Sequence, residues 1–150
     1  PVQSPISVWN GGKAEPVFKR VVTLGDGWLA SSSTSAEEFA RGWAKIREHA
    51  AAARKDPDTL MPAKFCYTHI ESTAEKALQV LQERLPRYYA FPYDTARFTL
   101  SGPPSRCAEQ AQAFLRAGVQ TIIFSTVTHD RSQIERLARE VLVALRRTEG

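Results

Sequence analysis

Residues 118–145, GVQTIIFSTVTHDRSQIERLAREVLVAL, hold the pattern from which the fold is predicted. Residues 119–124 form a short apolar and β-branched run, which predicts a buried strand. Apolar residues then recur at intervals of three and four from Ile134 to Leu145, which predicts a helix that packs on a sheet by one face. A buried strand followed by such a helix is one unit of an α/β fold.

The same pattern recurs toward the N-terminus. We expect strands over residues 6–9, 28–30 and 63–70, each followed by a stretch with helical spacing. One of these helices is expected to begin at Ser35, because Ser35-Ala36-Glu37-Glu38 has the spacing of a capping box. Four strand–helix units imply parallel strands joined by right-handed crossovers. Two architectures satisfy this order: a small doubly wound sheet, or four of the eight units of a (β/α)8 barrel.

Composition narrows the class of protein. With 150 residues, 43% hydrophobic and 24% charged, the chain is expected to fold as one ordinary domain or as about half of a larger one. No run approaches the roughly 20 apolar residues that a membrane span needs. The arginines behind the net charge of +4 are scattered, so we expect no nucleic-acid partner. Two cysteines without a CxxC predict no metal site. No export signal is visible, so we expect a cytoplasmic protein that is trimmed or is a piece of a longer chain.

Three stretches taken together resemble the bacterial-luciferase-like monooxygenase family. PISVWNGGKAEPVFKRVVTLGDGW (5–28) is similar to a family segment in which Pro-Ile-x-Val-x-x-Gly-Gly leads to a helix and then to Asp-Gly-Trp. SAEEFARGWAKIREHAAAARKDPDTL (35–60) is similar to the next helix of the family, and SGPPSRCAEQAQAFLRAGVQTIIF (101–124) to a helix and strand near its C-terminus. The resemblance implies an α/β fold that forms the C-terminal half, units five to eight, of a TIM (β/α)8 barrel. Residues 1–150 would then be one half-barrel domain of a longer chain.

The resemblance also implies a function. Members of this family carry FMN or a deazaflavin coenzyme in the mouth of the barrel, and they oxidise a small organic substrate by oxygen insertion or hydride transfer. A half-barrel exposes strand edges, so we expect a homo-oligomer such as a dimer, or pairing with a complementary N-terminal half. Two other hypotheses stay open: a non-catalytic half-barrel that folds by dimerising, and a small doubly wound domain that binds a phosphorylated ligand.

The candidate site residues follow the predicted strands, where barrel chemistry is located. Asn10, Gly11, Gly12 and Lys13 are the cofactor-binding candidates, since glycines let backbone N–H groups approach a phosphate; the alternative is a tight turn. His69 and His129, at or just past the ends of two strands, are the catalytic candidates, because histidine exchanges protons near neutral pH. The aromatic stretch from Tyr88 to Phe98 is expected to form a lid or substrate pocket, or else a hydrophobic flap or oligomer contact.

Overall fold

The computed structural model describes residues 2, 4–89 and 92–147. Five strands lie parallel to their neighbours in one sheet. They are β1 (Trp9–Gly11), β2 (Gly27–Ala30), β3 (Met61–Ile70), β4 (Leu100–Gly102) and β5 (Thr121–Thr126). The helices are α1 (Glu15–Leu24), α2 (Ala36–Ala52), α3 (Ala74–Arg84), α4 (Thr95–Phe98), α5 (Pro104–Arg116), α6 (Arg131–Arg136) and α7 (Leu142–Arg147), and a π-helical turn, Leu137–Val141, joins the last two.

Strand β3 organises the sheet, because it pairs with three other strands. Residues 61–64 pair with β2 and residues 63–68 pair with β5, so β2 and β5 lie on opposite edges of β3. Strand β4 pairs with residues 68–70, and Thr68 also pairs with β5, so β4 continues the edge that β2 occupies. The strands β1, β2, β3 and β5 therefore follow one another in chain order, as in part of a barrel. The prediction of four strand–helix units is confirmed for these strands.

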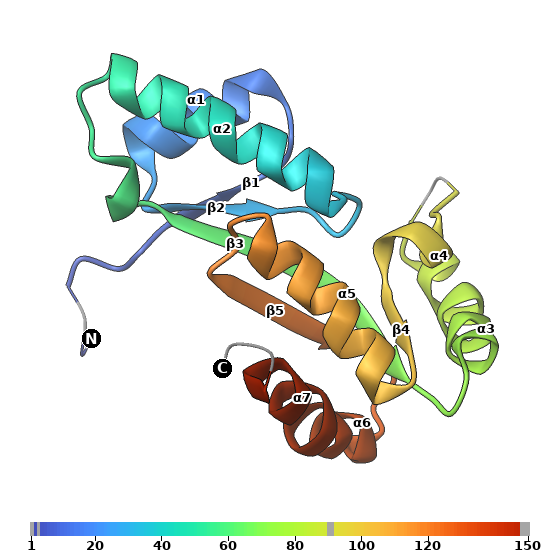
Figure 1. The fold of residues 1–150 in the computed structure, drawn as a ribbon. Helices are drawn as coiled ribbons and strands as arrows, with labels where there is room; N and C mark the ends of the chain where they lie inside the picture. The colour runs from blue at the N-terminus through green and yellow to red at the C-terminus, as the bar shows by residue number, and fades with distance from the viewer. Residues whose placement is uncertain (1, 3, 90–91, 148–150) are drawn as a thin grey trace.

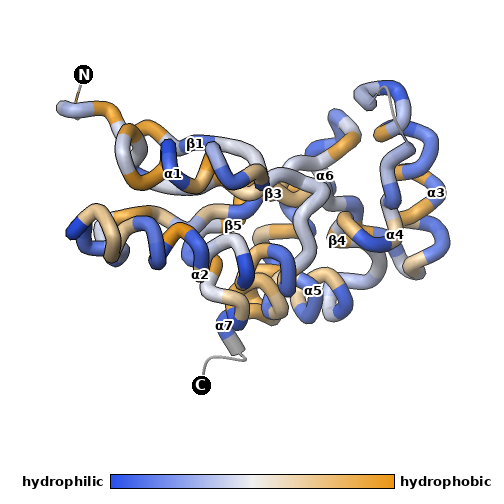
Figure 2. The backbone as a smooth tube through the Cα atoms, turned by 90° about the horizontal axis from the view of Figure 1, so that it is seen from above, coloured by the Kyte–Doolittle hydropathy of each residue, from blue (hydrophilic) through white to orange (hydrophobic). Residues whose placement is uncertain are grey.

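Four helical segments cover one face of this sheet. The buried core contains side chains of α1, α2, α5 and α7 together with Trp28 of β2 and Cys66 of β3. In Figure 1, α1 and α2 lie together at one end of β3, α5 crosses in front of β3 and β5, and α3 and α4 lie beside β4 at the other end. Figure 2 shows hydrophobic and hydrophilic stretches alternating along these helices, as expected for helices buried on one side.

The opposite face of the sheet is largely uncovered. Because side chains alternate along a strand, the registers place one apolar set on this face, which we call the open face. Most of its side chains are only half-buried, and Ile123 of β5 is 37% exposed. The half-buried or exposed apolar members of the open face are Trp9, Leu29, Met61, Phe65, Tyr67 and Ile123, while Ala63, which pairs with Leu29, is fully buried. An open sheet with helices on one side and an apolar second face is half of a (β/α)8 barrel in architecture.

Three expectations need correction. The first strand spans residues 9–11 rather than 6–9, because its pairing with β2 begins at Trp9 and Gly27. Asn10 and Gly11 therefore lie within a strand, not in a turn. Strand β4 was not expected, because over residues 101–124 the resemblance implies only a helix and the later strand 119–124. Three residues show no periodicity, and they form a strand only because they pair with β3.

The predicted start of a helix at Ser35 is confirmed. Ser35 caps α2 in a complete capping box with Glu38. The aromatic stretch 88–98 is irregular apart from α4, and Phe91 lies outside the described residues. In the part of the chain that the structure describes, every helix is too short or too polar to cross a bilayer.

Candidate functional site

A chain of hydroxyl groups lies where β2 and β3 end. The Tyr89 hydroxyl donates to the Tyr67 hydroxyl at 3.1 Å and lies 3.0 Å from the Ser32 Oγ. Since the Tyr89 proton goes to Tyr67, Ser32 is the donor to Tyr89, and Tyr67 keeps its own proton for a further acceptor. The Tyr89 and Tyr93 rings stack at 4.8 Å between centroids. We call Ser32, Tyr67, Tyr89 and Tyr93 the tyrosine cluster.

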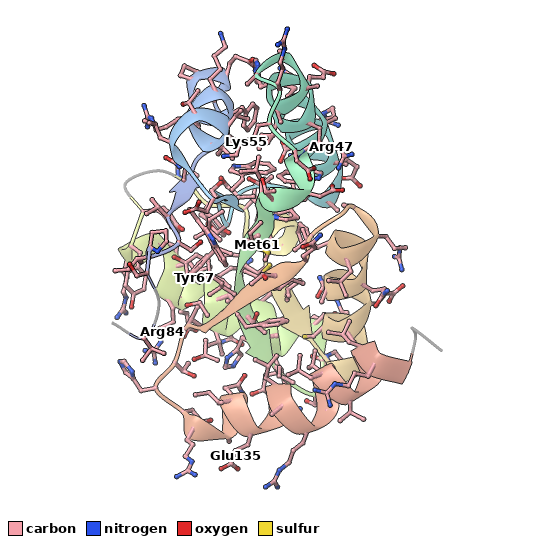
Figure 3. All side chains as sticks on the ribbon, turned by 90° about the vertical axis from the view of Figure 1, so that its left-hand side faces the viewer. Arg47, Lys55, Met61, Tyr67, Arg84 and Glu135 are labelled. Atoms are coloured by element: carbon pink, nitrogen blue, oxygen red, sulfur yellow. The ribbon has the colours of Figure 1, made fainter. Side chains whose placement is uncertain are left out.

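A pocket of about 250 Å³ lies beside this cluster on the open face. Phe65, Tyr67 and Tyr88 give it aromatic walls, and Arg84 from the end of α3 gives it a positive charge. Figure 3 shows Tyr67 and Arg84 on one side of the sheet and α5 on the other. The remaining lining comes from the end of β5 and the loop after it, residues Ser125 to His129. Aromatic walls with one cation and several hydroxyls suit a planar ligand that carries polar or negative groups.

Buried polar atoms without a partner also lie at the same end of the sheet. Among the described residues, the His69 Nδ1 and the Thr128 Oγ1 have no hydrogen-bond partner, and the same is true of the Asn10 Nδ2 in β1 and the Ser101 Oγ in β4. Such orphaned groups are uncommon in folded proteins and each requires an explanation. Two of them, at His69 and Thr128, lie at or just after the carboxyl ends of β3 and β5, which is the edge where barrel enzymes bind their ligands.

Burial keeps the His69 imidazole and the Tyr67 and Tyr93 phenols uncharged near pH 7. Burial is the largest influence on His69, which is 5% exposed, and it lowers the His69 pKa, although Glu71 at 3.9 Å opposes this. The imidazole is therefore uncharged near neutral pH, with one nitrogen able to accept a proton. Burial also raises the pKa of Tyr67, and raises that of Tyr93 to about 12. Both phenols thus remain hydrogen-bond donors over the physiological range.

The loop after β2 borders this site and is held through its carbonyl groups. Lys64 of β3 donates to the carbonyl oxygens of Ser31 at 2.7 Å and Ser32 at 3.1 Å. Lys13, from the loop after β1, donates to the Ser33 carbonyl at 3.3 Å. Two lysines from neighbouring segments therefore hold three successive carbonyls of residues 31–33.

The structure places the four cofactor-binding candidates in different surroundings. Lys13 reaches the loop after β2, and the Gly12 carbonyl accepts from the Trp28 indole at 2.7 Å. Gly12 has a φ of 117°, so this position requires glycine. Gly11 is exposed at the end of β1. The Asn10 side chain lies beside Gly25 on the helix-covered side of the sheet, apart from the tyrosine cluster. Their role in binding stays a prediction.

The two catalytic candidates also differ. His69 is buried at the end of β3, whereas His129 is exposed and lines the pocket beside Thr128. In the described part of the chain, no group of three His, Cys, Asp or Glu side chains is arranged to hold a metal ion.

The sequence interpretation missed Tyr67 and Lys64. Both lie in the predicted strand 63–70, and Lys64 is the one charged side chain in its apolar beginning. A lysine inside a strand that is otherwise apolar was the available indication that a buried cation serves a purpose there.

No family model matches the sequence, and no curated protein matches it. Solved structures match the fold. The F420-dependent tetrahydromethanopterin reductase from Methanopyrus kandleri matches with a TM-score of 0.76 and 18% identity, over 95% of this chain and 52% of the reductase. An F420-dependent secondary alcohol dehydrogenase, in complex with an F420–acetone adduct, matches with a TM-score of 0.77 and 14% identity, over 95% of this chain and 50% of the dehydrogenase.

The EDTA monooxygenase from Chelativorans sp. BNC1 matches with a TM-score of 0.73 and 13% identity, over 99% of this chain and 46% of the monooxygenase. These structures are members of the luciferase-like family that the sequence resembles, so the resemblance is confirmed at the level of the fold. The chain spans about half the length of the structures it matches. The α/β half-barrel fold predicted from the sequence is confirmed as well.

Proposed function

We propose that this chain is the C-terminal half of a luciferase-like, flavin-type oxidoreductase, in which it forms one side of the cofactor and substrate site. The observation that carries the proposal is an aromatic pocket, together with the orphaned polar atoms of His69 and Thr128, at the carboxyl ends of the strands. The three matched structures are oxidoreductases by name, which supports the same class of reaction.

The residues present suit a flavin-type ring. The pocket has aromatic walls in Phe65, Tyr67 and Tyr88, and its polar rim includes the Tyr67 hydroxyl, which has a proton to donate. Arg84, which lines this pocket, supplies positive charge for a phosphate group or another anionic group. When bound, FMN or a deazaflavin would supply the redox chemistry, by hydride transfer or, for FMN with oxygen, by oxygenation.

The chain's own residues would bind the ligands, exclude water and move protons. The Ser32–Tyr89–Tyr67 chain orients the Tyr67 proton toward the pocket, where it can hold a carbonyl oxygen of the ring or substrate. The neutral His69 imidazole can accept a proton at Nδ1, which has no hydrogen-bond partner among the residues that the structure describes. The aromatic side chains lower the local dielectric, which strengthens each of these hydrogen bonds.

The proposal includes a partner that completes the barrel. The open face exposes apolar side chains, and β1 and β5 each have one edge without a strand beside it among the described residues. An apolar face with free edges tends to associate. We infer that a complementary N-terminal half covers it, and a second copy of this chain is the alternative that the same surface permits.

The direct test is a titration of FMN into the purified protein, followed by the change in flavin fluorescence. We expect His69→Ala to weaken FMN binding about tenfold, as expected for the loss of one buried hydrogen-bond partner. The matched control is His49→Ala, because His49 is paired with Glu15 between α1 and α2 on the outer side. Equal effects of the two variants would contradict a cofactor site at the mouth.

The same titration with a deazaflavin separates the two cofactors. Binding of the deazaflavin but not of FMN would favour the hydride-transfer enzyme over the monooxygenase. If neither binds while the protein assembles through its open face, the non-catalytic half-barrel replaces the enzyme.

A further inference from the structure

Lys64 is a buried cation whose partners are almost all main-chain atoms. Its residue is 0% exposed, and its Nζ donates to the carbonyls of Ser31 at 2.7 Å, Ser32 at 3.1 Å and Phe65 at 2.6 Å. The Phe114 ring of α5 lies 5.1 Å from Nζ. An ammonium group has three protons, so these three carbonyls use all of them.

This arrangement depends on the charge of Lys64. No carboxylate in the described chain lies within ion-pair distance of its Nζ, so the cation is stabilised by carbonyl dipoles and by the aromatic ring. Burial lowers the Lys64 pKa to about 8, while Cys66 on β3 and Glu38 on α2 both act to raise it. A neutral amine keeps only two protons, so deprotonation leaves one of the three carbonyls without its donor.

The carbonyls that Lys64 holds belong to the loop that carries Ser32. Ala30 pairs with Lys64 across β2 and β3, so the loop begins directly beside this side chain. The Ser32 hydroxyl, in turn, begins the hydrogen-bond chain to Tyr89 and Tyr67. The loop of residues 31–32 therefore connects the buried Lys64 ammonium with the Tyr67 hydroxyl, which is the donor in the pocket.

We propose that Lys64 is a positioning residue of the candidate site: its ammonium braces residues 31–32 from below and thereby fixes the Ser32 hydroxyl that orients Tyr89 and Tyr67. The importance of this brace for activity rests on the proposed function, but the brace itself does not. Loss of the Lys64 proton loosens the loop, so the placement of Ser32 depends on pH near the point where Lys64 titrates.

The test follows the backbone amide shifts of Ser32 and Ser33 by ¹H–¹⁵N NMR, on the purified protein without added cofactor, from about pH 6 to about pH 10. We expect these amides, and the ring signals of Tyr67 and Tyr89, to move together with a common midpoint near the Lys64 pKa of about 8. In Lys64→Arg the cation stays charged throughout this range, so the transition should disappear while the loop remains in its low-pH position.

Two further variants complete the design. Lys64→Met should also abolish the transition, with the loop amides displaced at every pH; if this variant does not fold, Lys64→Arg carries the test alone. The matched control is Lys55→Met, because the Lys55 Nζ also donates to two carbonyls, those of Val22 and Gly25, each at 3.0 Å. The control should keep the midpoint.

A transition that is missing from the wild type, or that persists in Lys64→Arg, overturns the proposal. Because no cofactor is added, failure of FMN to bind in the earlier titration would leave this result intact, and the two proposals fail separately.

Discussion

At the scale of single residues, Gly42 shows how the packing of Trp28 limits the sequence. Gly42 lies within α2, where alanine is usually preferred by about 1 kcal/mol. A Cβ atom at this position would lie 2.6 Å from the Cη2 of Trp28, which is fully buried between the rings of Phe18 and Phe39. The glycine is therefore required by the close approach of the indole and not by the helix.

We expect Gly42→Ala to lower the free energy of unfolding by about 1–3 kcal/mol, because overpacking against a rigid ring outweighs the gain in helix propensity. Chemical denaturation measures this. Ala44→Gly, at an exposed position of the same helix, is the control and should cost about 1 kcal/mol from propensity alone. A stabilised Gly42→Ala variant would show that Trp28 has room to move.

Lys64 gives a second prediction at this scale. The folded chain releases the Lys64 proton near pH 8, whereas the unfolded chain holds it up to the ordinary lysine value of 10.5. Between these values the unfolded state binds more protons, so the stability of the wild type rises with pH relative to Lys64→Met, by about 3 kcal/mol in total.

Burial raises the pKa values of Cys66 and Cys107 to about 11, so these thiols act in the opposite direction and lower stability as the pH rises. Comparing the wild type with Lys64→Met reduces this effect, because both proteins contain the two cysteines. Urea denaturation at several pH values measures the difference. A difference that does not change with pH would mean that Lys64 keeps its ordinary pKa in the folded state.

At the scale of elements, strand β3 and the start of α2 determine where the site lies. Strand β3 spans ten residues and pairs with β2, β4 and β5, so it holds together the segments that carry Ser32, Tyr67 and the pocket loop after β5. Helix α2 begins directly after the braced loop, and the Ser35 Oγ accepts from the Glu38 amide at 3.2 Å. The position of this helix start is set by the capping box.

We expect Ser35→Ala to cost about 1 kcal/mol of unfolding free energy, because it removes the hydroxyl that accepts from the Glu38 amide, while the backbone N–H of residue 35 still donates to the Glu38 carboxylate. Ser72→Ala is the matched control, since Ser72 is exposed just before α3 and Thr73 caps that helix instead; it should change stability by less than about 0.5 kcal/mol. Thermal unfolding compares the two variants. Equal losses would indicate that the Ser35 hydroxyl contributes nothing as a cap.

At the scale of the whole molecule, the uncovered face of the sheet is the dominant feature. Helices pack on one face of the sheet, as Figure 1 shows, and the other face presents half-buried apolar side chains. A sheet of parallel strands is normally covered on both faces. We therefore expect a second body, the complementary half or another copy of the chain, to pack against this face.

We expect Ile123→Glu to prevent assembly of this chain with the partner proposed to cover the open face, because the substitution places a charge in an apolar contact. The control is Val143→Glu: Val143 on α7 is 38% exposed, almost the same as the 37% of Ile123, but it lies on the helix-covered side. Light scattering after size exclusion measures the mass of each form. Assembly that survives Ile123→Glu, or that Val143→Glu also abolishes, would contradict a contact through the open face.

Much of the fold could be predicted from the sequence because its determinants are local. Apolar spacing in 134–145, the capping box at Ser35 and the β-branched run 119–124 depend only on neighbouring residues, and they suffice for the α/β class and for four strand–helix units. The bounds of β1 and the existence of β4 depend on pairing with β2 and β3, which no local pattern records.

Less of the candidate site could be predicted from the sequence. His129 was a candidate because it follows a predicted strand, and the aromatic stretch was one because aromatic residues can line a pocket; His129 and Tyr88 both line the pocket, and Tyr89 and Tyr93 stack in the tyrosine cluster beside it. The meeting of Ser32, Tyr67 and Tyr89, the burial of Lys64 and the turning of Asn10 toward the helices were decided only by the tertiary structure. These contacts join segments tens of residues apart in the chain, so they arise only when the sheet brings the strand ends together.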